Sequence, residues 1–138
     1  MPQVRELMTK DPRTVQPEAS AVDAAKLMRD EDAGVAPIAA GDGRLVGIVT
    51  DRDIAIRVVA EGKDPGSTKV KDIASQNLVT IDPQQDLDEV LRLMAKHQVR
   101  RLPVVEEDGK LIGIVAQADI ARHTDAARTG EVVEQISE

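Results

Sequence analysis

A hydroxyl and a carboxylate lie three residues apart at Thr50 and Asp53, directly after the apolar run from Leu45 to Val49. Two interpretations fit this spacing. In the first, Thr50 caps a helix and Asp53 is its third residue, the reciprocal pair of a capping box. In the second, both side chains face a cleft at the end of a strand, where they suit the vicinal hydroxyls of a ribose and the helix N-terminus favours an anion. A capping side chain can also contact a ligand, so the two interpretations are compatible.

Arg100 and Arg101 form the second set of residues with ligand chemistry, and they precede Pro103. A guanidinium at a strand entry can hold phosphate through two parallel N–H bonds. Adjacent arginines are also common on solvated surfaces, and this alternative stays open. His97 and His123 have no partner at metal-ligand spacing, and the chain has no nucleophile, HExxH, Walker A or GxGxxG motif. We therefore expect neither a metal site nor catalytic residues.

The composition excludes several classes of function. The chain has 138 residues, a formal net charge of −7, no cysteine and no Phe, Trp or Tyr. Because no ring can stack on a base and a negative charge opposes binding to phosphate backbones, we expect no nucleic-acid partner. Without cysteine there is no disulfide framework or thiolate site. The chain also has no long apolar run and no signal core, so we expect no membrane span and a cytoplasmic protein.

The elements that must position these residues occur twice. LVGIVTDRDI at residues 45–54 reappears as LIGIVAQADI at residues 111–120, and this offset of 66 aligns residues 4–58 with residues 70–124 without a gap. The period is longer than that of solenoid repeats, so the chain is interpreted as two copies of one module. The predicted parts are unit 1 at 1–62, a linker at 63–69, unit 2 at 70–124 and a polar tail at 125–138, with both units in one compact domain.

Each copy predicts the same order of elements, a short lead helix followed by strand, helix, strand, strand and helix. The first long helix of each copy has the strongest signal, because an oxygen-bearing side chain lies three residues before an acid. These caps are Ser20 with Asp23 and Asp86 with Glu89, and the helices should end near Asp32 and Gln98. The other expected elements are lead helices at 4–10 and 70–76, extended stretches at 13–16 and 79–82, and strands at 35–39, 45–49, 102–105 and 111–115.

The paired motifs resemble those of the tandem cystathionine-beta-synthase (CBS) domain pair, also called a Bateman module. The residues that carry the resemblance are 47–53 and 113–119, the Pro37 and Pro103 strand entries, and the openings at Thr14 and Thr80, and together they cover about residues 3–124. The resemblance implies an α+β fold in which two β-α-β-β-α units pack sheet to sheet about a pseudo-two-fold axis and leave two clefts.

The resemblance also implies a function. Family members commonly bind AMP, ADP, ATP or S-adenosylmethionine in these clefts, and pairs often dimerise. We therefore predict a non-enzymatic regulatory module with an adenosine-type ligand, no other cofactor, and a homodimer or a separate protein partner as its output. The first cleft would use Thr50 and Asp53 for ribose, Leu78, Val79, Leu102 and Pro103 around the base, and Arg100 or Arg101 for phosphate. The weaker second cleft would use Arg13, Ala36, Pro37 and Asp119.

A second hypothesis comes from a difference between the copies. Ala116 replaces the Thr50 hydroxyl in the second motif, while Asp119 keeps the acid. This eroded second motif and the absence of aromatic residues favour clefts that no longer bind a ligand. The alternative function is therefore a ligand-free dimeric scaffold with vestigial clefts.

Overall fold

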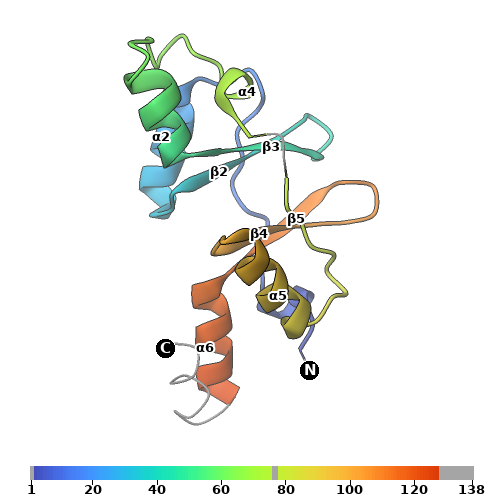
Figure 1. Cartoon of the computed structure of the whole chain (residues 1–138). Coiled ribbons are helices and arrows are strands. Elements are labelled where there is room, and N and C mark those ends of the chain that lie inside the picture. Colours follow the sequence, from blue (N-terminus) through green and yellow to red (C-terminus); the bar gives the residue numbers. More distant parts are fainter. Residues whose placement is uncertain (1, 76–77, 128–138) are drawn as a thin grey trace. The chain divides into compact units, whose positions relative to one another are not determined.

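The structure is a computed structural model that describes residues 2–75 and 78–127. Helices and strands mix along the chain, which confirms the α+β class (Figure 1). In chain order the elements are α1 (Val4–Leu7), β1 (Thr9–Lys10), α2 (Ala21–Glu31), β2 (Val35–Ala39), β3 (Leu45–Thr50), α3 (Asp51–Ile54), the π-helix η1 (Ala55–Val59), α4 (Val70–Ile73), α5 (Leu87–His97), β4 (Arg101–Val105), β5 (Leu111–Ala116) and α6 (Gln117–Ala127).

The chain divides into two compact bodies. The first-repeat body comprises the described residues of Arg13–Leu78 together with Asp108–Leu111. The second-repeat body comprises the described residues up to Pro12, Val79–Glu107, and the described residues from Ile112 onward. Each body therefore contains chain segments from both sequence repeats.

The first-repeat body is built on the antiparallel hairpin of β2 and β3, in which Val35 pairs with Thr50 and Ala39 with Leu45. Gly43 in the turn has a φ of +91°, a left-handed conformation that glycine adopts without strain. Helix α2 and the α3–η1 helix lie side by side against the hairpin (Figure 1). The buried core consists of Ala21, Ala24, Leu27, Met28, Ala36, Ile38, Val49, Val58, Val70 and Ile73.

The second-repeat body contains a three-stranded sheet in the order β1, β5, β4. Helix α5 packs against β4, and α1 packs against α6 (Figure 1). The buried core consists of Val4, Leu7, Ile81, Val90, Met94, Leu102, Val104, Val115 and Ile120. Helix α6 runs to Ala127, so it includes the start of the predicted polar tail, and residues 128–138 lie outside the described part of the chain.

The predicted capping box at the start of α2 is confirmed, with both of its reciprocal hydrogen bonds present. The Ser20 amide donates to Asp23 Oδ2 (3.2 Å), and the Asp23 amide donates to Ser20 Oγ (3.1 Å). The helix ends at Asp32 in the left-handed conformation, with a φ of 50°. Side-chain hydrogen bonds thus define the start of this helix, and a left-handed residue whose amide donates to the Arg29 and Met28 carbonyls defines its end.

The predicted N-cap of α5 is confirmed, but of the two hydrogen bonds of a capping box it forms only the one that Asp86 accepts. The Glu89 amide donates to the Asp86 carboxylate at 3.1 Å, and the helix ends at Gln98 with a φ of 55°. The Glu89 side chain binds Arg92 one turn further on, at 2.5 Å, rather than turning back to the cap. An opposite charge three residues away therefore competes with the return bond of the capping box.

The lead helices are shorter than predicted, and each docks on the body of the other repeat. Helix α1 ends at Leu7 because Met8 is extended, and Thr9 then pairs with Ile114 of β5. The Val4 amide donates to the Gln85 carbonyl at 2.8 Å. A segment that opens the first sequence repeat is therefore held by the second-repeat body.

Helix α4 repeats this docking on the first-repeat body. The Val70 amide donates to the Ala19 carbonyl at 2.8 Å, at positions 66 residues from the Val4 and Gln85 pair. Ser75 then exchanges two backbone hydrogen bonds with Ile48 of β3, at 3.0 and 3.3 Å. The two lead segments are thus exchanged between the repeats with the same backbone pattern.

The predicted opening strands are reduced to single parallel bridges. Val15 bridges Ile38 in the first-repeat body, and Ile81 bridges Val104 in the second-repeat body. Pro17 and Pro83 follow shortly after these residues and cannot donate to a ladder, which is consistent with such short pairing.

Candidate functional site

The first motif lies where β3 runs directly into α3. The Thr50 amide donates to Asp53 Oδ2 at 2.9 Å, and the Asp53 amide donates to Thr50 Oγ1 at 3.1 Å. The capping interpretation of this pair is therefore confirmed. The bond from the Thr50 amide holds the Asp53 carboxylate at the start of the helix, and the bond from the Asp53 amide holds the Thr50 hydroxyl beside it.

The second carboxylate oxygen of Asp53 faces a cation. Arg57 Nε lies 4.0 Å from Asp53 Oδ1, beyond hydrogen-bond distance, and the Asp53 side chain is 15% exposed. A carboxylate has about four lone-pair sites, so Oδ1 keeps acceptor capacity for hydroxyl donors of a ligand. The arrangement suits a group that donates two hydrogen bonds, such as a vicinal diol.

Arg57 was not predicted as part of this motif. It stands four residues after Asp53, a spacing that places both side chains on one side of a helix. Its Nη1 also donates to the Ile73 carbonyl at 3.2 Å, a contact sixteen residues away in sequence. The i,i+4 spacing was a usable signal for the first contact, whereas the second depends on the docking of α4.

The second motif keeps the acid of the first and loses its hydroxyl. The Ala116 amide donates to Asp119 Oδ2 at 3.1 Å, as in the first copy. The other oxygen, Oδ1, accepts a hydrogen bond from Arg122, whose side chain is 74% exposed. Oδ1 of Asp119 is thus hydrogen-bonded to an arginine, whereas Oδ1 of Asp53 has its arginine, Arg57, at 4.0 Å.

The arginine pair lies at the start of β4. Arg100 is exposed, and its carbonyl accepts a 2.8 Å hydrogen bond from the Gln117 amide at the start of α6. Arg101 is half-buried as the first residue of the strand. Within the described residues neither guanidinium forms an ion pair with an acid, so both cations are available to an anion.

The residues predicted around the base differ in exposure. Leu78 and Val79 are half-buried, whereas the side chain of Leu102 belongs to the core of the second-repeat body. Pro103 is buried, and its carbonyl accepts a 3.0 Å hydrogen bond from Ile81. The half-buried pair therefore has more side-chain surface to offer a ligand than the two strand residues.

The residues predicted for the weaker second site have partners within their own bodies. Arg13 forms ion pairs with Asp30 at 3.6 Å and Glu31 at 3.8 Å. Ala36 and Pro37 are buried in the first-repeat body. Of the residues predicted for the first site, Thr50 and Asp53 are in contact in the first-repeat body. Arg101, Leu102 and Pro103 follow one another along β4 of the second-repeat body. Of the residues predicted for the second site, Asp119 belongs to the second-repeat body and Arg13 to the first.

The family model of the CBS domain matches this chain twice, over residues 4–60 and 70–125. The chain belongs to the CBS-domain family. It is 42% identical over 121 residues to the CBS domain-containing protein YhcV of Bacillus subtilis, covering 88% of this chain and 84% of that protein. It is 40% identical over 123 residues to hypoxic response protein 1 of Mycobacterium tuberculosis, covering 89% and 85%.

Solved CBS structures have the same fold. A crystal structure of hypoxic response protein 1 with two coordinated zinc ions matches with a TM-score of 0.81 at 39% identity, covering 88% of this chain and 98% of that one. CBSX2 in complex with AMP matches with a TM-score of 0.79 at 26% identity, covering 91% and 98%. The CBS domain pair of MJ0100, in complex with 5′-methylthioadenosine and S-adenosylmethionine, matches with a TM-score of 0.80 at 29% identity, covering 93% and 99%.

Two further observations bear on what the CBS pair can bind. Within residues 2–75 and 78–127, no group of three or more His, Asp or Glu side chains could hold a metal ion, and the chain has no cysteine. No helix in the described part of the chain is long and apolar enough to cross a bilayer.

Proposed function

We propose that this CBS pair is a non-enzymatic regulatory module of the cytoplasm that binds an adenosine-containing ligand, with Asp53 as its main ribose contact. The observation that carries the proposal is the geometry of Asp53, whose Oδ2 is fixed by the Thr50 amide at 2.9 Å while Oδ1 keeps acceptor capacity. CBS pairs of similar fold hold AMP or S-adenosylmethionine, which supports an adenosine ligand for this chain.

The remaining contacts are assigned by the family resemblance. Thr50 would help Asp53 to bind the ribose, and Arg100 or Arg101 would bind a phosphate. The half-buried Leu78 and Val79, together with Leu102 and Pro103, would surround the base. The second motif would bind more weakly through Asp119, with Arg13, Ala36 and Pro37, because Arg122 already pairs with that acid.

The ribose contact can be tested by removing the hydroxyls from the ligand. We expect AMP to bind the wild-type protein at least about tenfold more tightly than 2′-deoxy-AMP or 3′-deoxy-AMP, because the acceptor on Asp53 would lose a donor. Equilibrium dialysis would measure the three affinities. In Asp53→Asn the three nucleotides should bind alike. Equal affinities in the wild-type protein would show that the diol is not recognised and would contradict the proposal.

The phosphate contact needs a separate comparison. Adenosine lacks the phosphate, so it should bind wild type and Arg100→Gln/Arg101→Gln equally well. AMP should lose affinity in the double variant alone, because a charge-assisted contact is removed. If AMP and adenosine lost the same affinity, the arginines would not contact the phosphate.

A second candidate function is a dimeric scaffold that needs no ligand. The η1 helix supports it, because Ile56 and Val59 are 43% and 69% exposed and offer an apolar surface to a second copy. Sedimentation velocity would compare wild type with Val59→Asp. A dimer that Val59→Asp dissociates, together with a melting temperature that no adenosine nucleotide changes, would favour the scaffold over the sensor.

A further inference from the structure

Arg57 touches two parts of the first-repeat body that are distant in sequence. Its Nε faces Asp53 Oδ1 at 4.0 Å, and its Nη1 donates to the Ile73 carbonyl at 3.2 Å. Ile73 is the last residue of α4, where helix carbonyls lack partners within the helix and carry partial negative charge. One guanidinium therefore joins the carboxylate of the first motif to the end of a docked helix.

The helix that Arg57 reaches belongs in sequence to the second repeat. The segment 70–75 is held on the first-repeat body by the Val70 amide and by the two backbone bonds between Ser75 and Ile48. Ile48 lies only two residues before Thr50 on β3. The chain then continues into Leu78 and Val79. The Arg57 contact thus lies where the first motif meets the opening segment of the second repeat.

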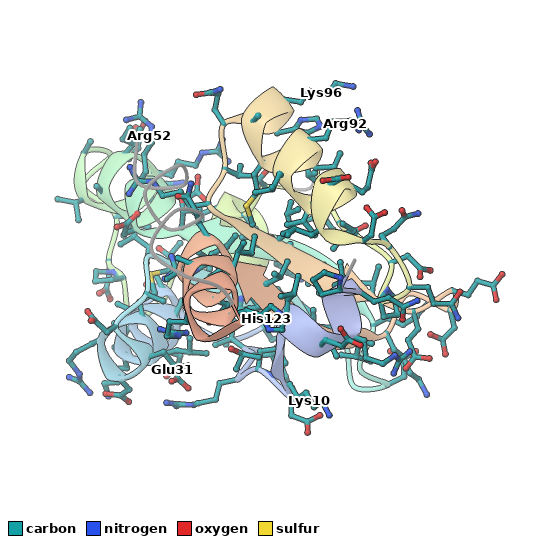
Figure 2. All side chains as sticks on the ribbon, turned by 90° about the horizontal axis from the view of Figure 1, so that it is seen from below. Lys10, Glu31, Arg52, Arg92, Lys96 and His123 are labelled. Atoms are coloured by element: carbon teal, nitrogen blue, oxygen red, sulfur yellow. The ribbon has the colours of Figure 1, made fainter. Side chains whose placement is uncertain are left out.

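The second motif does not reproduce this bridge. His123 occupies the position 66 residues after Arg57, and Figure 2 shows it on α6. The acid of that motif pairs instead with Arg122, whose side chain is 74% exposed. A π-helical turn also carries Arg57 in the first copy, whereas α6 is a regular α-helix, and single π-helical turns are frequent at functional sites.

We propose that Arg57 is a positioning residue that transmits ligand occupancy at Asp53 to the docking of residues 70–75. The ligand in this inference rests on the proposed function, whereas the route from Asp53 through Arg57 to Ile73 rests on the contacts of the structure. A ribose over Asp53 excludes water from the carboxylate and strengthens its attraction for Arg57. Arg57 is then held more firmly against the Ile73 carbonyl, and the α4 segment opens less often. Ligand binding and α4 docking thereby favour each other, as linkage requires.

The route can be tested without any ligand by a double-mutant cycle. Asp53→Asn keeps an oxygen for the Thr50 amide but removes the charge that anchors Arg57, and Arg57→Met removes the bridge. Hydrogen exchange of the amides of residues 70–75 is the readout. We expect each single variant to speed exchange about 2- to 10-fold, the range of one net hydrogen bond, and the double variant to match Arg57→Met alone. Independent, multiplying effects would overturn the route.

Two matched variants separate the bridge from general effects on the helix. Arg52→Met makes the same charge change five residues earlier, and Figure 2 shows the Arg52 side chain projecting away from the helix. It should leave exchange of residues 70–75 unchanged. Arg57→Lys keeps a cation near Asp53 but lacks the planar fork that spans two acceptors, so it should behave like Arg57→Met. Full protection in Arg57→Lys, or loss of protection in Arg52→Met, would overturn the role assigned to the guanidinium.

The ligand arm repeats the exchange experiment with saturating AMP. Exchange of residues 70–75 should slow in wild type and in Arg52→Met, and should not slow in Arg57→Met even when calorimetry shows that AMP is bound. Equal slowing in Arg57→Met would overturn the transmission through Arg57. If AMP binds none of the variants, the experiment is repeated with ADP, ATP and S-adenosylmethionine. Absence of binding by all four would overturn the proposed function and with it the transmission of occupancy, while the ligand-free cycle would still decide whether Arg57 links Asp53 to α4.

Discussion

The two lead segments dock with the same backbone hydrogen bonds but with different side chains. In the first-repeat body, Glu18 binds both Lys69 and Lys71 at 2.8 Å beside α4. The residue 66 positions after Glu18 is Gln84, so the second-repeat body has no carboxylate at this point. The two copies thus share their backbone geometry, and among the residues that the structure describes, an acid that bridges two lysines in this way occurs only beside α4.

The second-repeat body holds its lead segment by closer packing instead. A Cβ added at Gly113 of β5 would lie 2.5 Å from Met8 Sδ and 3.0 Å from the Thr9 carbonyl oxygen. A Cβ at the equivalent Gly47 would meet nothing nearer than 3.5 Å. The comparison shows that one backbone arrangement can be secured by charge in one copy and by steric fit in the other.

Gly113→Ala should have the largest effect on stability among the changes that probe this comparison. The added methyl group must displace Met8 and strain β1 against β5, and overpacking of this kind typically costs about 1–3 kcal/mol. Chemical denaturation would measure the loss. Gly47→Ala is the matched control and should change stability by less than about 1 kcal/mol. Equal losses in both variants would show that the second lead segment is not packed more closely than the first.

Substitutions at Thr50 and Ala116, each three residues before the acid of its motif, probe the difference between the motifs. Thr50→Ala should cost about 0.5–2 kcal/mol, because the Asp53 amide loses its capping acceptor. Ala116→Thr offers the same acceptor to the second motif and should stabilise it by up to about 1 kcal/mol. Thermal unfolding of the two variants and of the double exchange would check the signs. A destabilising Ala116→Thr would mean that α6 cannot accept the cap of the first copy.

The Glu18 ion pairs predict a smaller effect that depends on pH. Hydrogen bonds from Lys69 and then Lys71 lower the pKa of Glu18 from its ordinary value of 4.5 to about 2. A depressed carboxyl pKa stabilises the folded state above pH 4.5, and this contribution is lost as the pH falls toward 2. Glu18→Gln should therefore be less stable than wild type at neutral pH, and the difference should disappear near pH 2.

Glu61→Gln provides the matched control for the pH experiment, because Glu61 is an exposed acid of the same body. Its stability relative to wild type should not show the pH dependence of Glu18→Gln. Raised salt should also reduce the Glu18 effect, because exposed ion pairs are screened. A difference between Glu18→Gln and wild type that persisted at pH 2 would contradict the ion-pair origin.

Features coded by neighbouring residues could be predicted from the sequence. The caps at Ser20 and Thr50 follow from side chains three residues apart, and the ends at Asp32 and Gln98 follow from the apolar period. The Asp86 cap was predicted only in part, because the sequence does not say whether Glu89 turns back to the cap or forward to a cation.

Features that depend on which copy a segment joins could not be predicted. The two repeats match each other closely, so the local pattern is equally compatible with a lead segment on its own repeat or on the other. The sequence therefore predicts a lead helix over residues 4–10, whereas the helix ends at Leu7 and Thr9 pairs with β5. The Arg57 contact with Ile73 was missed for the same reason, since it exists only when α4 docks on the first-repeat body.

Calorimetric titration of wild type, Asp53→Asn and Asp119→Asn with AMP, ADP, ATP and S-adenosylmethionine tests the proposed function most directly. We expect at least one of these ligands to bind the wild-type protein. Asp53→Asn should weaken that ligand at least about tenfold, because a hydrogen bond to a charged group contributes about 1.5–3 kcal/mol. Asp119→Asn should change the affinity much less. No heat with any ligand up to millimolar concentration, where binding contributes about 4 kcal/mol, or equal losses in both variants, would contradict a sensor that depends on the first motif.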